Sequence, residues 1–172
     1  IFSCPSRRSA AALKEALGVP ICAHRATAER LEGQLKIDEE LYSGDIGELG
    51  GVPVEVLHTP GHARGHLAFG VGPQDCLVAG DLVAGQGTIV IDPPEGDMAD
   101  YLATLGALVR RGVGSVVPSH GPAAEDGEGL LLGTIAHRLR REEQLLGVIA
   151  ERGERGAYPI DLVSDLYPEV PV

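Results

Sequence analysis

The chain has 172 residues, 44% of them hydrophobic and 23% charged, a composition that is typical of a folded domain and excludes a disordered or collagen-like chain. Fourteen lysines and arginines against 25 aspartates and glutamates give a net charge of −11, which argues against the broad basic surface of a nucleic-acid-binding protein. Because no apolar run reaches the ~18 residues of a membrane span and no signal-peptide pattern opens the sequence, we expect a soluble, cytoplasmic protein without membrane contact.

Helices are predicted where strong helix formers, or apolar residues at helical spacing, lie between capping signals. The predicted helices cover residues 9–17, 26–31, 97–111 and 126–152, with a last short helix over 159–166. Ser9 and Asp97 are the expected N-caps of the first and third helices, and Gly18 is the expected end of the first.

Short apolar runs bounded by turn residues predict the strands. These strands cover residues 19–24, 54–57, 67–71, 76–79, 88–91 and 115–118. Because helices alternate with strands and hairpins, the predicted fold class is α/β with a mixed β-sheet.

Potential metal ligands follow three of these strands. The segments are Thr59-Pro60-Gly61-His62, then Gly80-Asp81, and then Pro118-Ser119-His120-Gly121-Pro122. Two imidazoles and one carboxylate on strand-end loops suit zinc, which takes nitrogen and oxygen ligands. Each segment taken alone is more often a structural turn. The three cysteines have no CxxC spacing and predict neither a disulfide framework nor a thiolate zinc site.

In this order, the three segments resemble the metallo-β-lactamase superfamily of hydrolases, whose TPGH, GD and PxHGP motifs they match. The resemblance implies a partial αββα metallo-β-lactamase sandwich over residues 1–134, with two zinc ions at the strand ends. The resemblance implies that His62 is a ligand of the first metal and that His120 is a ligand of the second. Asp81 is the catalytic carboxylate that bridges both ions.

Residues 135–172 are similar to the start of a small helical, winged-helix-like extension found in the beta-lactamase-like protein 2 branch, some of whose members are described as RNA-cleaving enzymes. Too few residues follow for a recognition helix and a wing. Three arginines lie beside Glu142 and Glu143, a pattern typical of a solvated helix face; they are Arg138, Arg140 and Arg141. We therefore expect no nucleic-acid binding by this part.

The family's HxHxDH motif, which supplies four further ligands, should lie just ahead of residues 10–14. The sequence has Ser6-Arg7-Arg8-Ser9 there, with no histidine or aspartate. Cys4 can replace at most one of the four ligands. Because the first residue is Ile1 rather than Met, we expect a piece of a longer enzyme; the alternative is a degenerate relative that has lost its metals.

Other polar side chains near these motifs have weaker signals. His66 lies close enough to His62 to be a partner that orients a ligand. His58 is expected only to end a strand, and His24 has no assigned role. Arg64 can meet a substrate's negative charge, although an exposed loop arginine is the more common case.

The resemblance implies a two-zinc hydrolase in which metal-activated water attacks an ester, a thioester or a phosphodiester. The expected substrate is a small-molecule ester or thioester, or RNA. Without the HxHxDH motif, this chain is expected to bind zinc weakly or not at all and to be inactive alone. A metal-free binding or regulatory relative is the alternative function, and a marginally folded piece without function is a third. The oligomeric state stays open.

Overall fold

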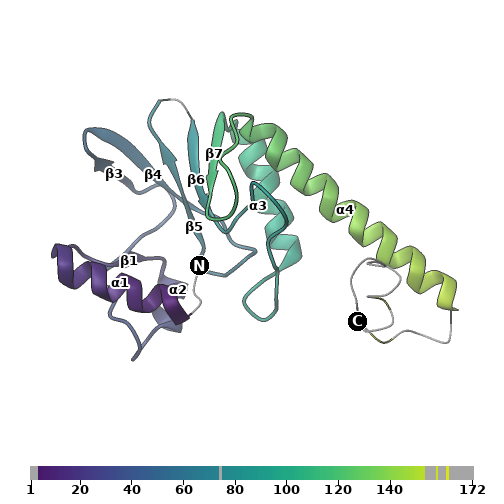
Figure 1. The fold of residues 1–172 in the computed structure, drawn as a ribbon, viewed down its shortest axis with the longest axis horizontal. Coiled ribbons are helices and arrows are strands. Elements are labelled where there is room, and N and C mark those ends of the chain that lie inside the picture. Colours follow the sequence, from purple (N-terminus) through teal and green to yellow (C-terminus); the bar gives the residue numbers. More distant parts are fainter. Residues whose placement is uncertain (1–3, 74, 154–157, 159–161, 163–172) are drawn as a thin grey trace. The chain divides into compact units, whose positions relative to one another are not determined.

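The computed structural model describes residues 4–73, 75–153, 158 and 162. For residues 4–8 it describes the backbone alone. The chain divides into two compact units, Ile1–Leu132 and Gly133–Val172. The first contains the sheet and most of the helices, and the second contains most of the last helix (Figure 1). Within the described ranges, none of the helices combines the length and the apolar character that crossing a membrane requires.

A five-stranded mixed sheet with the order β3-β4-β5-β6-β7 forms the centre of the first unit. Their bounds are β3 Ile46–Leu49, β4 Val52–His58, β5 Leu67–Val71, β6 Cys76–Gly80 and β7 Ser115–Pro118. Strands β3 to β6 pair antiparallel, and β7 runs parallel to β6. The predicted α/β class with a mixed sheet is confirmed, because hairpins join the antiparallel strands and a helix lies between the two parallel ones.

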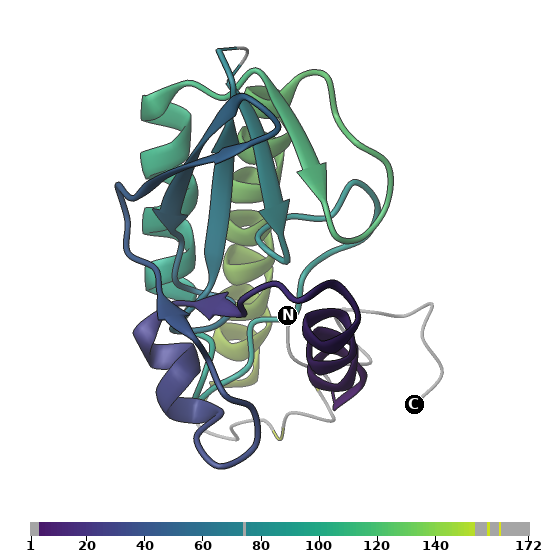
Figure 2. The ribbon, with the colours of Figure 1, turned by 90° about the vertical axis from the view of Figure 1, so that its left-hand side faces the viewer.

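The helices are α1 Cys4–Leu17, α2 Arg25–Arg30, α3 Met98–Arg111 and α4 Gly127–Arg152. A separate two-stranded parallel pair joins β1 Cys22–Ala23 to β2 Glu39–Glu40. Helix α3 covers one face of the large sheet (Figure 2). The apolar side of α3 is completely or nearly completely buried, through Tyr101, Leu105 and Leu108.

Strands β6 and β7 alternate between this covered face and an open face. In β6 the side chain of Leu77 is buried, whereas Val78 is 39% exposed. In β7 the side chain of Val116 is buried, whereas Val117 is 42% exposed. The core of the first unit therefore lies between the sheet and α3, since alternate residues of a strand point to opposite faces.

Several predicted element ends are confirmed by their caps. The Asp97 carboxylate accepts a hydrogen bond from the backbone N–H of Asp100 (2.9 Å), so Asp97 is the N-cap of α3. Helix α1 ends at Leu17, and Gly18 follows it with a φ of +64°. The predicted helix over 26–31 corresponds to α2, whose N-cap is His24.

Three predictions about the elements are wrong. Residues 88–91 form a loop, because they pair with no strand of the described chain and the Val90 carbonyl instead accepts a bond from a side chain. Ser9 is not an N-cap, since α1 begins at Cys4. Of the strand predicted over 19–24, only the two residues of β1 form a strand, because the partner strand β2 has only two residues.

Strand β3 was not predicted, because its residues lie in an acidic, glycine-containing stretch and all four are exposed. It exists because Gly50 and Gly51, both with positive φ, turn the chain back to pair with β4. Of the predicted winged-helix-like extension over 135–172, the structure describes 135–153, 158 and 162, which include most of α4. The rest of it, and the predicted helix over 159–166 apart from Leu162, lie outside the described residues.

The N-cap of α3 supports a stability prediction. Asp97→Ala should lower the free energy of unfolding by about 1 kcal/mol, because the first turn of the helix loses its acceptor. Asp97→Asn is the matched control and should stay close to wild type, since asparagine is an equally good cap. Urea denaturation measures both variants; an equal loss of stability in the two would show that the cap is not the cause.

Candidate functional site

A tight turn after β4 positions His62. Gly61 has a φ of +129°, and a Cβ at this position would collide with the backbone of Tyr101 in α3. The Gly61 carbonyl also accepts a hydrogen bond from the N–H of Asp97 (2.8 Å). Only glycine fits both the conformation and the contact, so the residue before His62 is fixed against the start of α3.

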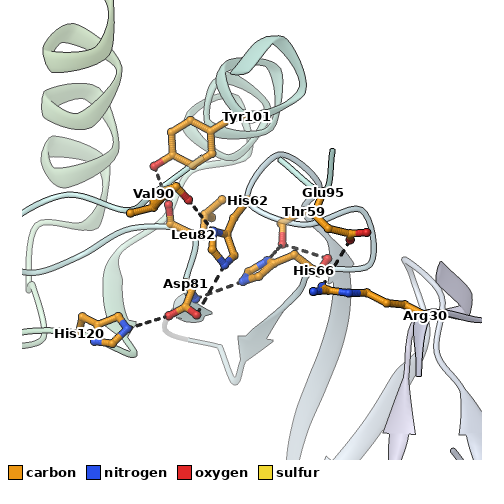
Figure 3. Close-up of polar contacts among 10 residues, drawn as sticks. All are labelled: Arg30, Thr59, His62, His66, Asp81, Leu82, Val90, Glu95, Tyr101 and His120. Atoms are coloured by element: carbon orange, nitrogen blue, oxygen red, sulfur yellow. Dashed lines mark hydrogen bonds and ion pairs between the residues drawn. The ribbon is translucent and has the colours of Figure 1, made fainter. Parts of the chain in front are cut away.

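The imidazole of His62 is held in one orientation. Its Nδ1 donates to the carbonyl oxygen of Val90 at 2.8 Å, because a carbonyl can only accept. In the neutral ring this bond leaves the lone pair on Nε2, which faces Asp81 Oδ2 at 3.8 Å (Figure 3). A histidine that donates from one nitrogen to a backbone carbonyl is typical of metal ligands.

Asp81 and His120 follow the two neighbouring parallel strands β6 and β7. The Asp81 side chain is only 11% exposed, whereas that of His120 is 68% exposed. His120 Nε2 lies 3.3 Å from Asp81 Oδ1. The two imidazoles therefore face opposite oxygens of one carboxylate (Figure 3).

Close backbone contacts support the loop that carries His120. The N–H of Gly85 donates to the His120 carbonyl (2.8 Å), and that of Ser119 donates to the Gly80 carbonyl (2.9 Å). A Cβ at Gly85 would collide with the carbonyl of Pro122. The loops after β6 and β7 are therefore packed backbone against backbone.

His66 is buried and bridges two of the strand ends. Its Nε2 accepts from the backbone N–H of Asp81 (3.2 Å), so its Nδ1 carries the proton and donates to Thr59 Oγ1 (2.7 Å). Burial lowers the pKa of His66 from its ordinary 6.5 to about 4, which keeps the ring neutral. Its predicted role in orienting a ligand stays a prediction, and the bond it makes is to Asp81 rather than to His62.

The other predicted residues lie outside this cluster. His58 ends β4 as predicted, and its Nε2 donates to the Arg64 carbonyl at 2.7 Å. His24, which had no assigned role, caps α2 and stacks on His58 with ring centroids 4.1 Å apart. Arg64 is exposed, which is the common case expected for a loop arginine. Cys4 begins α1, and since its side chain is not among those described, its substitution for a ligand stays a prediction.

Sequence reasoning did not find the supporting residues Thr59, Val90 and Tyr101. The available signal for Thr59 is its place directly before the Pro60-Gly61 turn, and the signal for Tyr101 is its helical spacing from the apolar residues Leu105 and Leu108. Val90 acts through its carbonyl oxygen, which every residue type has. No sequence signal can therefore indicate its contact with His62.

The donors fit a metal in chemical type but not in number. Two ligand atoms on one tetrahedral zinc at about 2.1 Å lie roughly 3.4 Å apart, close to the two histidine–aspartate separations. The geometry thus fits a carboxylate shared between two ions, each with one imidazole. Within residues 4–73 and 75–153, however, three or more histidine, cysteine, aspartate or glutamate side chains do not gather around any one point where an ion could bind.

The buried neutral imidazole supports a pH prediction. As the pH falls from about 6.5 to about 4, the unfolded chain takes up a proton at His66 that the folded chain does not, so this contribution to stability is lost. The loss should approach about 3 kcal/mol. Unfolding by urea across this pH range measures it, and His66→Gln should flatten the dependence. An unchanged slope in His66→Gln would contradict the account.

Comparison with known proteins agrees with the geometry. The family model of the metallo-beta-lactamase superfamily matches residues 8–120. The chain is 31% identical over 121 residues to a beta-lactamase-like protein 2 homolog of Drosophila melanogaster, covering 70% of this chain and 40% of that protein. It is 26% identical over 134 residues to an atrochrysone carboxyl ACP thioesterase of Claviceps purpurea, covering 76% and 42%. The chain spans about two fifths of the length of these relatives.

Solved structures show the same fold. A metallo-beta-lactamase family protein from Thermus thermophilus superposes with a TM-score of 0.67 at 25% identity, over 94% of this chain and 53% of that one. The protein TTHA1623, solved in a di-iron-bound form, superposes with a TM-score of 0.56 at 30% identity, over 73% and 68%. The region matched by the family model contains all three converging side chains, and the chain belongs to the metallo-beta-lactamase superfamily of hydrolase-like proteins.

Proposed function

We propose that this chain carries part of a two-metal hydrolase site, in which Asp81 bridges two zinc ions and His62 and His120 each bind one of them. The observation that carries the proposal is the convergence of both Nε2 atoms on opposite oxygens of Asp81, at 3.8 and 3.3 Å. When bound, such ions lower the pKa of a water ligand and polarise the bond to be cleaved.

The residues of this chain orient the ligands. Val90 holds the His62 ring with Nε2 toward Asp81, and His66 holds the backbone N–H of Asp81. Residues that hydrogen-bond to a metal ligand and orient it in this way typically raise metal affinity 10-fold to 100-fold. The di-iron-bound form of TTHA1623 supports metal binding by this fold without specifying zinc for this chain.

The substrate class that we propose is a small-molecule thioester or ester. The name of the thioesterase relative supports a thioester carbonyl as the group attacked. RNA is the weaker candidate, because a net charge of −11 opposes the approach of a polyanion.

In the part of the chain that the structure describes, two ligands face each proposed ion, whereas catalytic zinc typically has three protein ligands. We therefore expect weak metal binding and no turnover by the chain alone. The same observation favours the second candidate function, a metal-free binding or regulatory module that keeps the fold.

Metal binding by the chain tests the proposed ligands. Zinc titration by calorimetry should give a weak affinity that falls at least tenfold in Asp81→Asn, because the bridging oxygen loses its charge. His137→Ala is the matched control, since His137 lies in α4 and is not among the proposed ligands. Equal affinities in wild type and Asp81→Asn would contradict the ligand assignment, and absence of any binding would favour the metal-free module.

Hydrolysis tests the reaction. Fusing an HxHxDH-containing segment from a relative ahead of α1 should restore zinc binding and thioester hydrolysis, since it completes both ligand sets. His62→Ala in the fused protein should abolish both. The assay uses an acyl N-acetylcysteamine thioester, p-nitrophenyl acetate and bis(p-nitrophenyl) phosphate. A zinc-loaded fused protein that hydrolyses none of the three would contradict the proposed function.

A further inference from the structure

One buried side chain of α3 reaches the loop that carries Asp81. The side chain of Tyr101 is fully buried, and its hydroxyl donates to the carbonyl of Leu82 at 2.7 Å. Leu82 is itself completely buried and directly follows Asp81. Because a buried hydroxyl and a buried carbonyl each cost free energy when left without a partner, this bond ties α3 to the residue after Asp81.

The backbone of the same residue meets the loop that carries His62. Gly61 approaches Tyr101 so closely that a Cβ at Gly61 would collide with the Tyr101 N and Cα atoms. The N–H of Tyr101 is bonded to the carbonyl of Asp97, and the N–H of Asp97 is bonded to the carbonyl of Gly61. Tyr101 therefore contacts the residue before His62 with its backbone. It contacts the residue after Asp81 with its side chain, through the bond to Leu82 that Figure 3 shows.

We propose that Tyr101 is a positioning residue that sets the distance between the Asp81 carboxylate and the His62 imidazole. This inference rests on the proposed function, in which these two groups bind one ion. Their separation of 3.8 Å is set by two loops that come from different strands, so a shift of either loop changes it directly. Sites of this kind work only within about 0.5 Å of the productive geometry.

Two other supports act beside Tyr101. His66 holds the N–H of Asp81 from the side of β5, and Val90 orients only the ring of His62. Asp81 thus lies between two hydrogen bonds. Its own N–H donates to His66, and the carbonyl of the next residue, Leu82, accepts from Tyr101. His66 also binds Thr59, which begins the His62 turn, whereas Tyr101 packs directly against Gly61, the residue before His62.

The test compares Tyr101→Phe with Thr104→Val in the full chain. Phenylalanine keeps the ring and removes the bond to Leu82. Thr104→Val is the matched control, since it removes another α3 bond, from Thr104 Oγ1 to the Pro60 carbonyl (2.8 Å), on the loop that carries His62. Amide hydrogen exchange, followed by NMR without metal, is read at the N–H of Asp81. Zinc affinity is measured on the same samples by calorimetry.

We expect the Asp81 amide to exchange at least tenfold faster in Tyr101→Phe and at the wild-type rate in Thr104→Val. Zinc affinity should fall 10-fold to 100-fold in Tyr101→Phe. Equal Asp81 exchange in the two variants would overturn the positioning role. If wild type binds no zinc while the exchange difference persists, the proposed function fails and the positioning role stands.

A measurement on the wild type keeps the test independent of how well the variants fold. The hydroxyl proton of Tyr101 is buried and bonded to Leu82, so it should exchange slowly enough to give an NMR signal. That signal should show a nuclear Overhauser effect to the backbone protons around the Leu82 carbonyl. A hydroxyl proton in rapid exchange with water would overturn the proposal, since it would show that the bond is not kept.

Discussion

The neutral imidazole of His66 is the interaction on which the geometry of the site depends. One ring nitrogen must donate to Thr59 at the end of β4, and the other must accept from the N–H of Asp81 after β6. Only the uncharged ring can do both, and its burial favours that form. Because β5 lies between β4 and β6 in the sheet, this one side chain joins the ends of three adjacent strands.

The loops around this bridge are rigid because of backbone contact. Gly61 lies against α3, Gly65 lies against Thr27 of α2, and Gly85 lies against Pro122. Each contact leaves no room for a Cβ, so glycine is required by space and not only by conformation. The three converging side chains therefore hold their relative positions by packing of the protein itself, which is the arrangement expected of a preorganised site.

The sequence predicts well those parts whose signal is local. The strands β6 and β7 are short apolar runs, and Asp97 is a good N-cap followed by an amphipathic helix. Strand β3 could not be predicted, because an exposed edge strand needs no apolar residues on a buried side. Residues 88–91 have the composition of a strand, but strand formation requires a partner, which depends on the tertiary structure.

The same division holds for the site. His62, Asp81 and His120 were predicted as one cluster from a family resemblance in three motifs, and the structure brings them together. Thr59 and Tyr101 act through single hydrogen bonds to groups distant in sequence, and no local pattern distinguishes them from core residues. Their contribution follows from the packing of α3 and the sheet, which only the structure shows.

The most direct test of the metal assignment is a crystal structure of the chain soaked in zinc, with anomalous scattering recorded at the zinc absorption edge. The account predicts an anomalous peak within bonding distance of the Asp81 carboxylate and of Nε2 of His62 or His120. A peak only at other histidines, such as the stacked pair His24 and His58, or no peak at a zinc concentration well above the Kd that titration gives for this chain, would contradict it.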